Sequence, residues 1–203
     1  MKMVLPLFNM APIISSGFVV EDLSTDSLSN SINHNKNGYI QYKDNEIFLK
    51  KLTRTLNSQN TYIGPLFLHK DLKTIKFEEV FGMVNFDWML NLFHNMKCFE
   101  ICDTLYHRFV EKSNLSLKDV YRKKDFHFSL YITEKYWNEY PRDTKISHKR
   151  IHASIAKYYY LTGNKHKARF YLRKTECSLK NLGYFFSTYF GYKYILKKFD
   201  IFR

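Results

Sequence analysis

Short apolar runs separated by polar stretches dominate the first half of this chain, and they predict strands. Residues 62–68 form an apolar run typical of a buried strand, and residues 99–106 alternate apolar and polar side chains as a strand with one covered face does. Residues 18–20 favour a further strand. Residues 21–38 are rich in Ser and Asn and end at an Asn-Gly pair, so we expect an exposed loop there.

Helical spacing occurs between these runs. The apolar residues of segment 44–52 fall on one stripe of a helix, and Asp44 is a candidate N-cap. Residues 87–93 carry large apolar side chains at the same spacing, which predicts a helix that begins near Asp87. Because strands alternate with helices, we expect an α/β fold with a sheet core and flanking helices. In this sheet, strands 62–68 and 99–106 should be neighbours, with the helix that begins near Asp87 packed against them.

From Ser147 onward the periodicity is helical. Ser147 is a candidate N-cap of a helix that Gly163 ends, and Asn164 is a candidate N-cap of a second helix. The inner side of the second helix is expected to carry Ala168, Tyr171, Leu172, Thr175 and Leu179. Segment 156–169 resembles one hairpin of a tetratricopeptide-like repeat, and a stable solenoid needs about three repeats. The sequence therefore predicts a single α-helical C-terminal hairpin that caps another structure.

Composition limits the class of protein. With 203 residues, of which 45% are apolar and 18% aromatic, the chain can bury a core. Its apolar runs are far shorter than the ~18 residues of a membrane-spanning helix, and its first residues lack the pattern of a signal peptide. Cys98, Cys102 and Cys177 have no spacing typical of zinc ligands, so we expect reduced, mostly buried thiols in a cytoplasmic protein.

Charge divides the chain into two regions. Residues 1–143 hold 18 Lys and Arg against 17 Asp and Glu, whereas residues 144–203 hold 14 against two. We therefore predict an α/β region at residues 1–143 and a basic, aromatic-rich helical extension at residues 144–203. Such a basic block favours a negatively charged partner, either anionic lipid or nucleic acid; a solvated helix surface has the same composition.

The final segment, residues 184–203, mixes aromatic residues with Lys193, Lys197, Lys198 and Arg203. Aromatic anchors on one face and basic residues on the other are typical of a helix that lies at a membrane interface. A core-packing helix with a solvated row of lysines has the same pattern. The segment thus makes an anionic membrane surface one of the expected partners, with the protein peripheral on the inner face.

Four elements occur in an order that resembles a known family. They are Tyr62-Ile-Gly-Pro-Leu-Phe-Leu-His-Lys-Asp71, Asn85-Phe-Asp-Trp-Met-Leu-Asn-Leu92, Tyr106-His-Arg108 and Ser113-Asn-Leu-Ser116. Together they resemble the second half of the catalytic domain of a family-2 glycosyltransferase. That family has an apolar strand, then an acidic motif, a strand that ends in Tyr-Arg, and an Asn-x-Ser loop. The resemblance covers roughly residues 55 to 200.

The resemblance implies a partial GT-A-like mixed sheet and transfer of a sugar from a nucleotide-sugar donor to an acceptor hydroxyl, in synthesis of a cell-envelope polysaccharide or glycolipid. Asn85 stands where the family usually has its base, so the resemblance makes Asp87 the candidate catalytic base. Asn85 can only orient the acceptor, since an amide takes no proton at neutral pH. Trp88, His107 and Arg108 are the further substrate-binding candidates, and the last two would contact the diphosphate.

The resemblance also implies a divalent cation, Mg²⁺ or Mn²⁺, held by carboxylates against the diphosphate. Asp44 and Glu46 are the metal candidates if segments 4–9, 21–26 and 39–46 are a compressed form of the family's first half. The spacing of these segments favours another interpretation, in which the chain corresponds to the part after the metal motif. The nucleotide-binding half would then be missing or be supplied by another chain.

Rival interpretations use the same residues differently. The chain is alternatively a basic helical interaction protein whose residues 144–203 bind nucleic acid or another protein without catalysis, since interleaved aromatic and basic residues suit base stacking and phosphate contact. An inactive remnant of a glycosyltransferase is a third possibility. In these cases Asp87 is a helix-entry residue and His107 and Arg108 are a surface pair at a strand end, while Glu78 and Glu79 face solvent.

Overall fold

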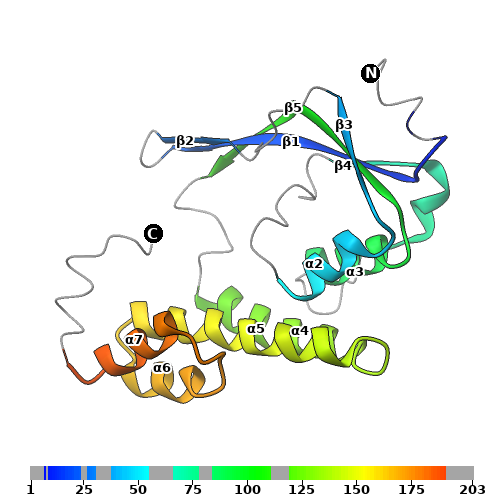
Figure 1. Cartoon of the computed structure of the whole chain (residues 1–203). Coiled ribbons are helices and arrows are strands. Elements are labelled where there is room, and N and C mark those ends of the chain that lie inside the picture. The colour runs from blue at the N-terminus through cyan, green and yellow to red at the C-terminus, as the bar shows by residue number, and fades with distance from the viewer. Residues whose placement is uncertain are drawn as a thin grey trace. The chain divides into compact units, whose positions relative to one another are not determined.

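The computed structural model describes Leu7 and residues 9–23, 27–30, 38–54, 66–77, 84–110 and 119–190. The chain divides into two compact units, Met1–Lys118 and Asp119–Arg203 (Figure 1). The first unit is a mixed sheet with helices, as the α/β prediction requires, and the second is helical. The division falls earlier than the boundary predicted at residue 143, because a helix that the sequence analysis did not predict packs with the second unit.

The first unit is organised around β1 (Figure 1). The strands are β1 (Ile13–Asp22), β2 (Ser27–Asn30), β3 (Tyr39–Tyr42), β4 (Leu66–Leu68) and β5 (Cys98–Val110). β5 runs parallel to β1 along its whole length, and β3 lies antiparallel on the outer edge of β5. β2 and β4 pair antiparallel with the other edge of β1, at its end and its start respectively. The sheet therefore has mixed strand directions and is assembled from segments far apart in sequence.

The start of β1 is buried on both faces. Ile13, Ile14, Ser15 and Ser16 are all fully buried, which is the pattern of a strand covered on both sides rather than a half-exposed one. The register with β5 shifts on both sides of Gly17, as in a β-bulge, where a residue without Cβ is easily accommodated. The prediction of a strand at residues 18–20 is confirmed, and the strand is longer than predicted.

The helical elements with bounds in the described part of this unit are α2 (Glu46–Leu52), η2 (Lys70–Thr74) and α3 (Val84–Phe93). α2 and α3 pack against each other, with the Phe48 ring 4.8 Å from that of His94. Each buries an apolar stripe, as their helical spacing predicts. The predicted helices at residues 44–52 and 87–93 are confirmed, each with a shift of two or three residues at its start.

Three details of the first unit differ from the sequence prediction. Of the strand predicted at residues 62–68, residues 66–68 form β4 and residues 62–65 lie outside the described structure. The strand predicted at residues 99–106 is part of β5, and β1 lies between β4 and β5, so they are not direct neighbours. The segment predicted as an exposed loop contains β2, which forms a hairpin with β1. Asp44 is not the N-cap of α2: that position is held by Asn45, with a left-handed φ of 61° and no side-chain cap.

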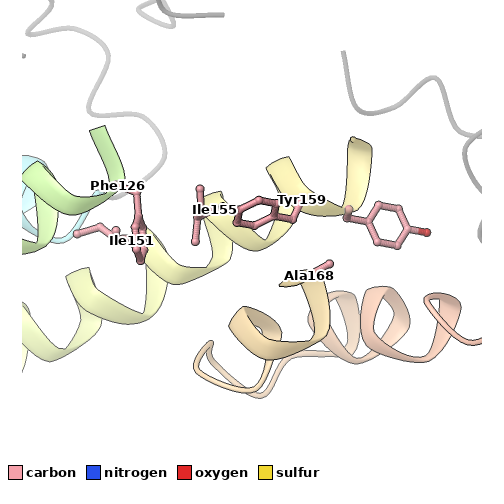
Figure 2. Packing of buried hydrophobic residues seen from close by; sticks show 6 residues of the cluster. Phe126, Ile151, Ile155, Tyr159 and Ala168 are labelled. Carbon is pink, nitrogen blue, oxygen red and sulfur yellow. The ribbon is translucent and has the colours of Figure 1, made fainter. Parts of the chain in front are cut away.

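The second unit contains α4 (Asp119–Glu134), α5 (Pro141–Leu161), α6 (Lys165–Leu172) and α7 (Leu179–Ser187). Its core is the cluster of Phe126, Ile151, Ile155, Tyr159, Tyr160 and Ala168. Figure 2 shows Ile151, Ile155 and Tyr159 along α5, with Ala168 reaching towards them from α6. α4 and α6 thus pack on α5, and α7 packs on α6.

The helix ends follow local signals. Gly163 takes a φ of 82° after α5, and the Asn164 side chain accepts a hydrogen bond of 3.1 Å from the Lys167 backbone N–H, so the predicted hairpin is confirmed at its turn. Ser147 does not cap α5: the helix begins at Pro141, and Ser147 is buried within it. Leu179 does not face inward in the second helix, because α6 ends at Leu172 and Leu179 is 90% exposed at the start of α7.

Within the described ranges, none of the helices has both the length and the apolar character that crossing a membrane requires.

Candidate functional site

Asp87 lies in the first turn of α3 and is buried, with 5% of its surface exposed. The positive end of the helix dipole stabilises a carboxylate at this position. Its neighbour Phe86 lies under the Arg54 guanidinium, whose central carbon is 4.5 Å from the ring centre. Asn85, by contrast, is exposed. The predicted base is therefore a buried carboxyl group in the first turn of a helix, two residues from an exposed amide.

Trp88 has a packing role in the structure. It is 5% exposed, its indole N–H donates a 3.1 Å hydrogen bond to the Ile75 carbonyl, and its ring stacks on Phe77 at 4.7 Å between centres. These contacts satisfy both the polar and the apolar part of the side chain. The structure thus places Trp88 as the residue that anchors α3 to the segment after η2.

His107 and Arg108 lie near the end of β5, paired with Val19 and Val20 of β1. His107 Nε2 is 2.9 Å from Glu21 Oε2, and its ring stacks on Phe109. His107 is nine residues beyond Cys98, the first residue of β5, which corresponds to about 30 Å along an extended strand. His107 therefore lies far along β5 from the start of the strand, and its partner there is Glu21.

The candidate metal ligands do not fit a divalent cation. The Glu46 carboxylate is 2.8 Å from the Lys50 ammonium and accepts the Lys43 backbone N–H, and the hydrogen bond from Lys50 is the main cause of its lowered pKa. Asp44 is exposed in the turn before α2. Among the described residues, His, Cys, Asp and Glu side chains do not gather into a group of three that could hold a metal. Glu78, Glu79 and the loop at residues 113–116 lie outside the described residues.

The sheet contains a buried polar group that the sequence analysis missed. Glu100 is fully buried in β5 and accepts a hydrogen bond from the Tyr42 hydroxyl of β3. Ser15 of β1 is also fully buried and donates to the Phe99 carbonyl at 3.5 Å. The only sequence signal for this group is the polar residues within runs that otherwise read as apolar strand, Ser15-Ser16 and Glu100.

Cys98 lies close enough to Ser15, Glu100 and Lys51 to interact with all three. Burial raises the pKa of the Cys98 thiol to about 12, so the thiol stays protonated and is a poor nucleophile at neutral pH. Burial lowers the pKa of the Lys51 ammonium to about 8, and the nearby Cys98 acts weakly in the opposite direction. These groups are suited to holding strands and α2 together rather than to covalent chemistry.

The helical unit combines positive charge with exposed aromatic rings. Residues 119–190 contain 15 Lys and Arg against six Asp and Glu. Arg169 lies 4.4 Å from the centre of the Tyr189 ring and Lys174 lies 4.4 Å from that of Phe170, and both rings are half exposed. Cations beside accessible rings can contact phosphates while the rings stack on bases.

No protein-family model, curated protein or solved structure matches this chain. Function is therefore inferred from the residues and their placement.

Proposed function

We propose that the chain forms the acceptor side of a glycosyltransferase related to family 2, which transfers a sugar from a nucleotide-sugar donor to an acceptor hydroxyl. The resemblance of residues 62–116 supports this proposal, and the position of Asp87 carries it. Asp87 lies in the first turn of α3, on the connection from β4 to β5, and these strands flank the same residues of β1, since Ile13 pairs with both Leu68 and Cys98. The acidic residue thus lies on a connection between two strands that both pair with the start of β1.

Asp87 would act as the general base. Its carboxylate takes the proton from the acceptor hydroxyl while that oxygen attacks the sugar carbon and the nucleoside diphosphate leaves. The N-terminal end of α3 favours the ionised form that a base needs. Asn85, exposed in the same turn, can orient the acceptor by hydrogen bonding. His107 is engaged by Glu21 and has no part in this mechanism.

The test is Asp87→Asn in the complete enzyme that contains this chain. Release of nucleoside diphosphate from a panel of nucleotide sugars is measured with and without acceptor. Loss of a general base is expected to lower kcat by about 10²–10⁴-fold while the circular dichroism spectrum is unchanged. Asp103→Asn is the matched control, because Asp103 is an exposed carboxylate on β5 and the same charge is removed. Its kcat should equal that of the wild type.

Two results would contradict the proposal at different levels. If Asp87→Asn turns over at the wild-type rate, the assignment of the base is wrong. If the complete protein neither binds nor hydrolyses a nucleotide sugar, glycosyl transfer itself is wrong.

The charge of residues 119–190 favours a second candidate, a helical unit that binds nucleic acid. The cation–ring pairs Arg169–Tyr189 and Lys174–Phe170 are the specific observation in its favour. Fluorescence anisotropy with a single-stranded RNA oligonucleotide should then show affinity that falls steeply as salt increases. The variant R169Q/K174Q should bind more weakly than K124Q/K145Q, which removes two charges from other helices. Equal affinities would reject these pairs as the contact site.

A further inference from the structure

The helical unit has a cavity of about 270 Å³ between α5 and α7. Its volume is close to the lower end of the range for small-molecule sites. The polar lining residues are Arg150, Ser154 and Lys157 from α5 and Lys180 and Asn181 from α7. All of these residues belong to the second compact unit, so the cavity is complete within that unit.

The floor of the cavity is apolar and well held. Ala156, Tyr160 and Leu172 line it, and all three are buried. The Tyr160 hydroxyl is 2.8 Å from Ser187 Oγ, which joins α5 to α7 beneath the cavity. Because Tyr160 belongs to the core cluster and Ala156 and Leu172 are buried, the position of the floor is fixed by the fold.

The charge of the lining has one sign. Arg150, Lys157 and Lys180 are its charged residues, and none of the lining residues is acidic. Arg150 and Lys157 are seven residues apart and so lie on one face of α5. Lys180 and Asn181 are in the first turn of α7, the end at which a helix dipole is positive. The cavity is therefore a concentration of positive potential above an apolar floor.

The positive charges around this cavity repel one another. The pKa of Lys157 is lowered, first because of burial and then because of the positive charges of Lys180 and Arg122. An anion placed among these groups would remove this repulsion. A bound phosphate could accept hydrogen bonds from both ammonium groups and from the forked donors of Arg150.

We propose that this cavity binds the phosphate of a small phosphorylated molecule, with Arg150, Lys157 and Lys180 as its cationic ligands and the apolar floor beneath the organic part. Ser154 and Asn181 supply neutral hydrogen-bonding groups at the same opening. The site lies in the helical unit and does not depend on glycosyl transfer by Asp87. Free phosphate esters and phospholipid headgroups share the chemistry that it recognises.

The test is calorimetric titration of the full chain with inorganic pyrophosphate at physiological ionic strength. K157Q/K180Q should bind pyrophosphate at least tenfold more weakly than the wild type, whereas K124Q/K145Q should be unchanged. The control removes the same charge at two exposed positions that do not line the cavity. K157R/K180R should retain binding, which shows that loss in the glutamine variant comes from lost charge. Thermal unfolding of every variant confirms that it is folded.

Vesicles with and without phosphatidic acid distinguish the two sources of phosphate. If pyrophosphate displaces the protein from these vesicles and K157Q/K180Q binds them weakly, the ligand is a lipid headgroup. If pyrophosphate does not displace the protein from the vesicles and K157Q/K180Q binds them as the wild type does, the site takes soluble phosphate esters. Absence of pyrophosphate binding to the wild type, or equal loss in K157Q/K180Q and K124Q/K145Q, would overturn the proposal.

Discussion

Asn45 binds Asn95 through both parts of its side-chain amide, and Asn95 uses its side-chain oxygen and its backbone N–H. Asn45 Nδ2 donates to Asn95 Oδ1 at 2.7 Å, and the Asn95 backbone N–H donates to Asn45 Oδ1 at 2.5 Å. Both residues have left-handed backbone, with φ of 61° and 58°. The pair joins the start of α2 to the turn that follows α3, so it fixes the relative position of these two helices.

Replacing either asparagine tests this pair. Asn45→Ala and Asn95→Ala should each lower the free energy of unfolding by about 1–2 kcal/mol, because each loses hydrogen bonds and replaces an asparagine, which tolerates the left-handed region, with an alanine, which tolerates it less. The double variant should lose less than the sum, since both changes remove the same interaction. Urea unfolding measures all three values. Full additivity would show that the two residues are not energetically coupled.

Lys51 should make stability depend on pH. Its pKa of about 8 lies below the usual 10.5, so between these values the unfolded chain holds a proton that the folded chain has released. The free energy of unfolding should therefore rise with pH from about pH 8, by at most about 1.4 kcal/mol per pH unit. Below pH 8 Lys51 is protonated in both the folded and the unfolded chain, so its contribution to the free energy of unfolding does not change with pH.

Cys98 limits that rise. Its pKa of about 12 lies above the usual 9.0, so above pH 9 the unfolded chain loses a proton that the folded chain keeps, and stability falls. Lys51→Met should abolish the rise between pH 8 and 9, and it should raise stability at pH 7 by about 2–3 kcal/mol. Urea unfolding from pH 7 to 9.5 provides the measurement. A rise that persists in Lys51→Met would assign the effect to another group.

The three thiols should react at very different rates. All are free, with Cys177 exposed and Cys98 and Cys102 buried. One equivalent of a thiol reagent should be consumed rapidly by the native protein and two more only after unfolding, because reaction requires an accessible thiolate. Cys177→Ser is the control and should remove the rapid phase. A rapid phase of more than one equivalent would contradict the burial of the other two.

The end of α7 should bind anionic membranes if residues 184–203 form the predicted interfacial segment. Residues 191–203 lie outside the described structure, but Phe186 and Phe190 are 61% and 81% exposed. F186S/F190S should weaken sedimentation with phosphatidylserine vesicles, whereas Tyr131→Ser, which removes an exposed ring from α4, should not. High salt should release the wild type. Equal sedimentation of both variants would contradict the prediction.

Local signals explain which parts of the fold were predictable. The turn at Gly163 and Asn164 depends only on neighbouring residues, so the sequence predicted it correctly. α4 was not predicted because buried Ser129 and Thr133 interrupt its apolar stripe, and their burial depends on packing with another helix. The position of β1 between β4 and β5 likewise depends on pairings that no local pattern encodes.

The candidate site was predictable in position but not in surroundings. The helix start at Asp87 follows from spacing, and the structure has it in the first turn of α3. The role of Trp88 depends on Phe77 and the Ile75 carbonyl, which come from a separate segment. Glu100 was missed because a single polar residue in an alternating strand is expected to face solvent, and its burial depends on Tyr42 from another strand.

The pairing of β1 with β5 has a consequence during protein synthesis. Ser15 and Phe99 are hydrogen-bonded neighbours although 84 residues separate them in the chain. A ribosome therefore releases the apolar start of β1 long before its partner strand has been translated, and this nascent segment needs shielding from aggregation in the interval. The helical unit, in which consecutive helices pack on one another, has no such delay. The strand of this sheet that is translated before the others is thus among the last to reach its native pairing.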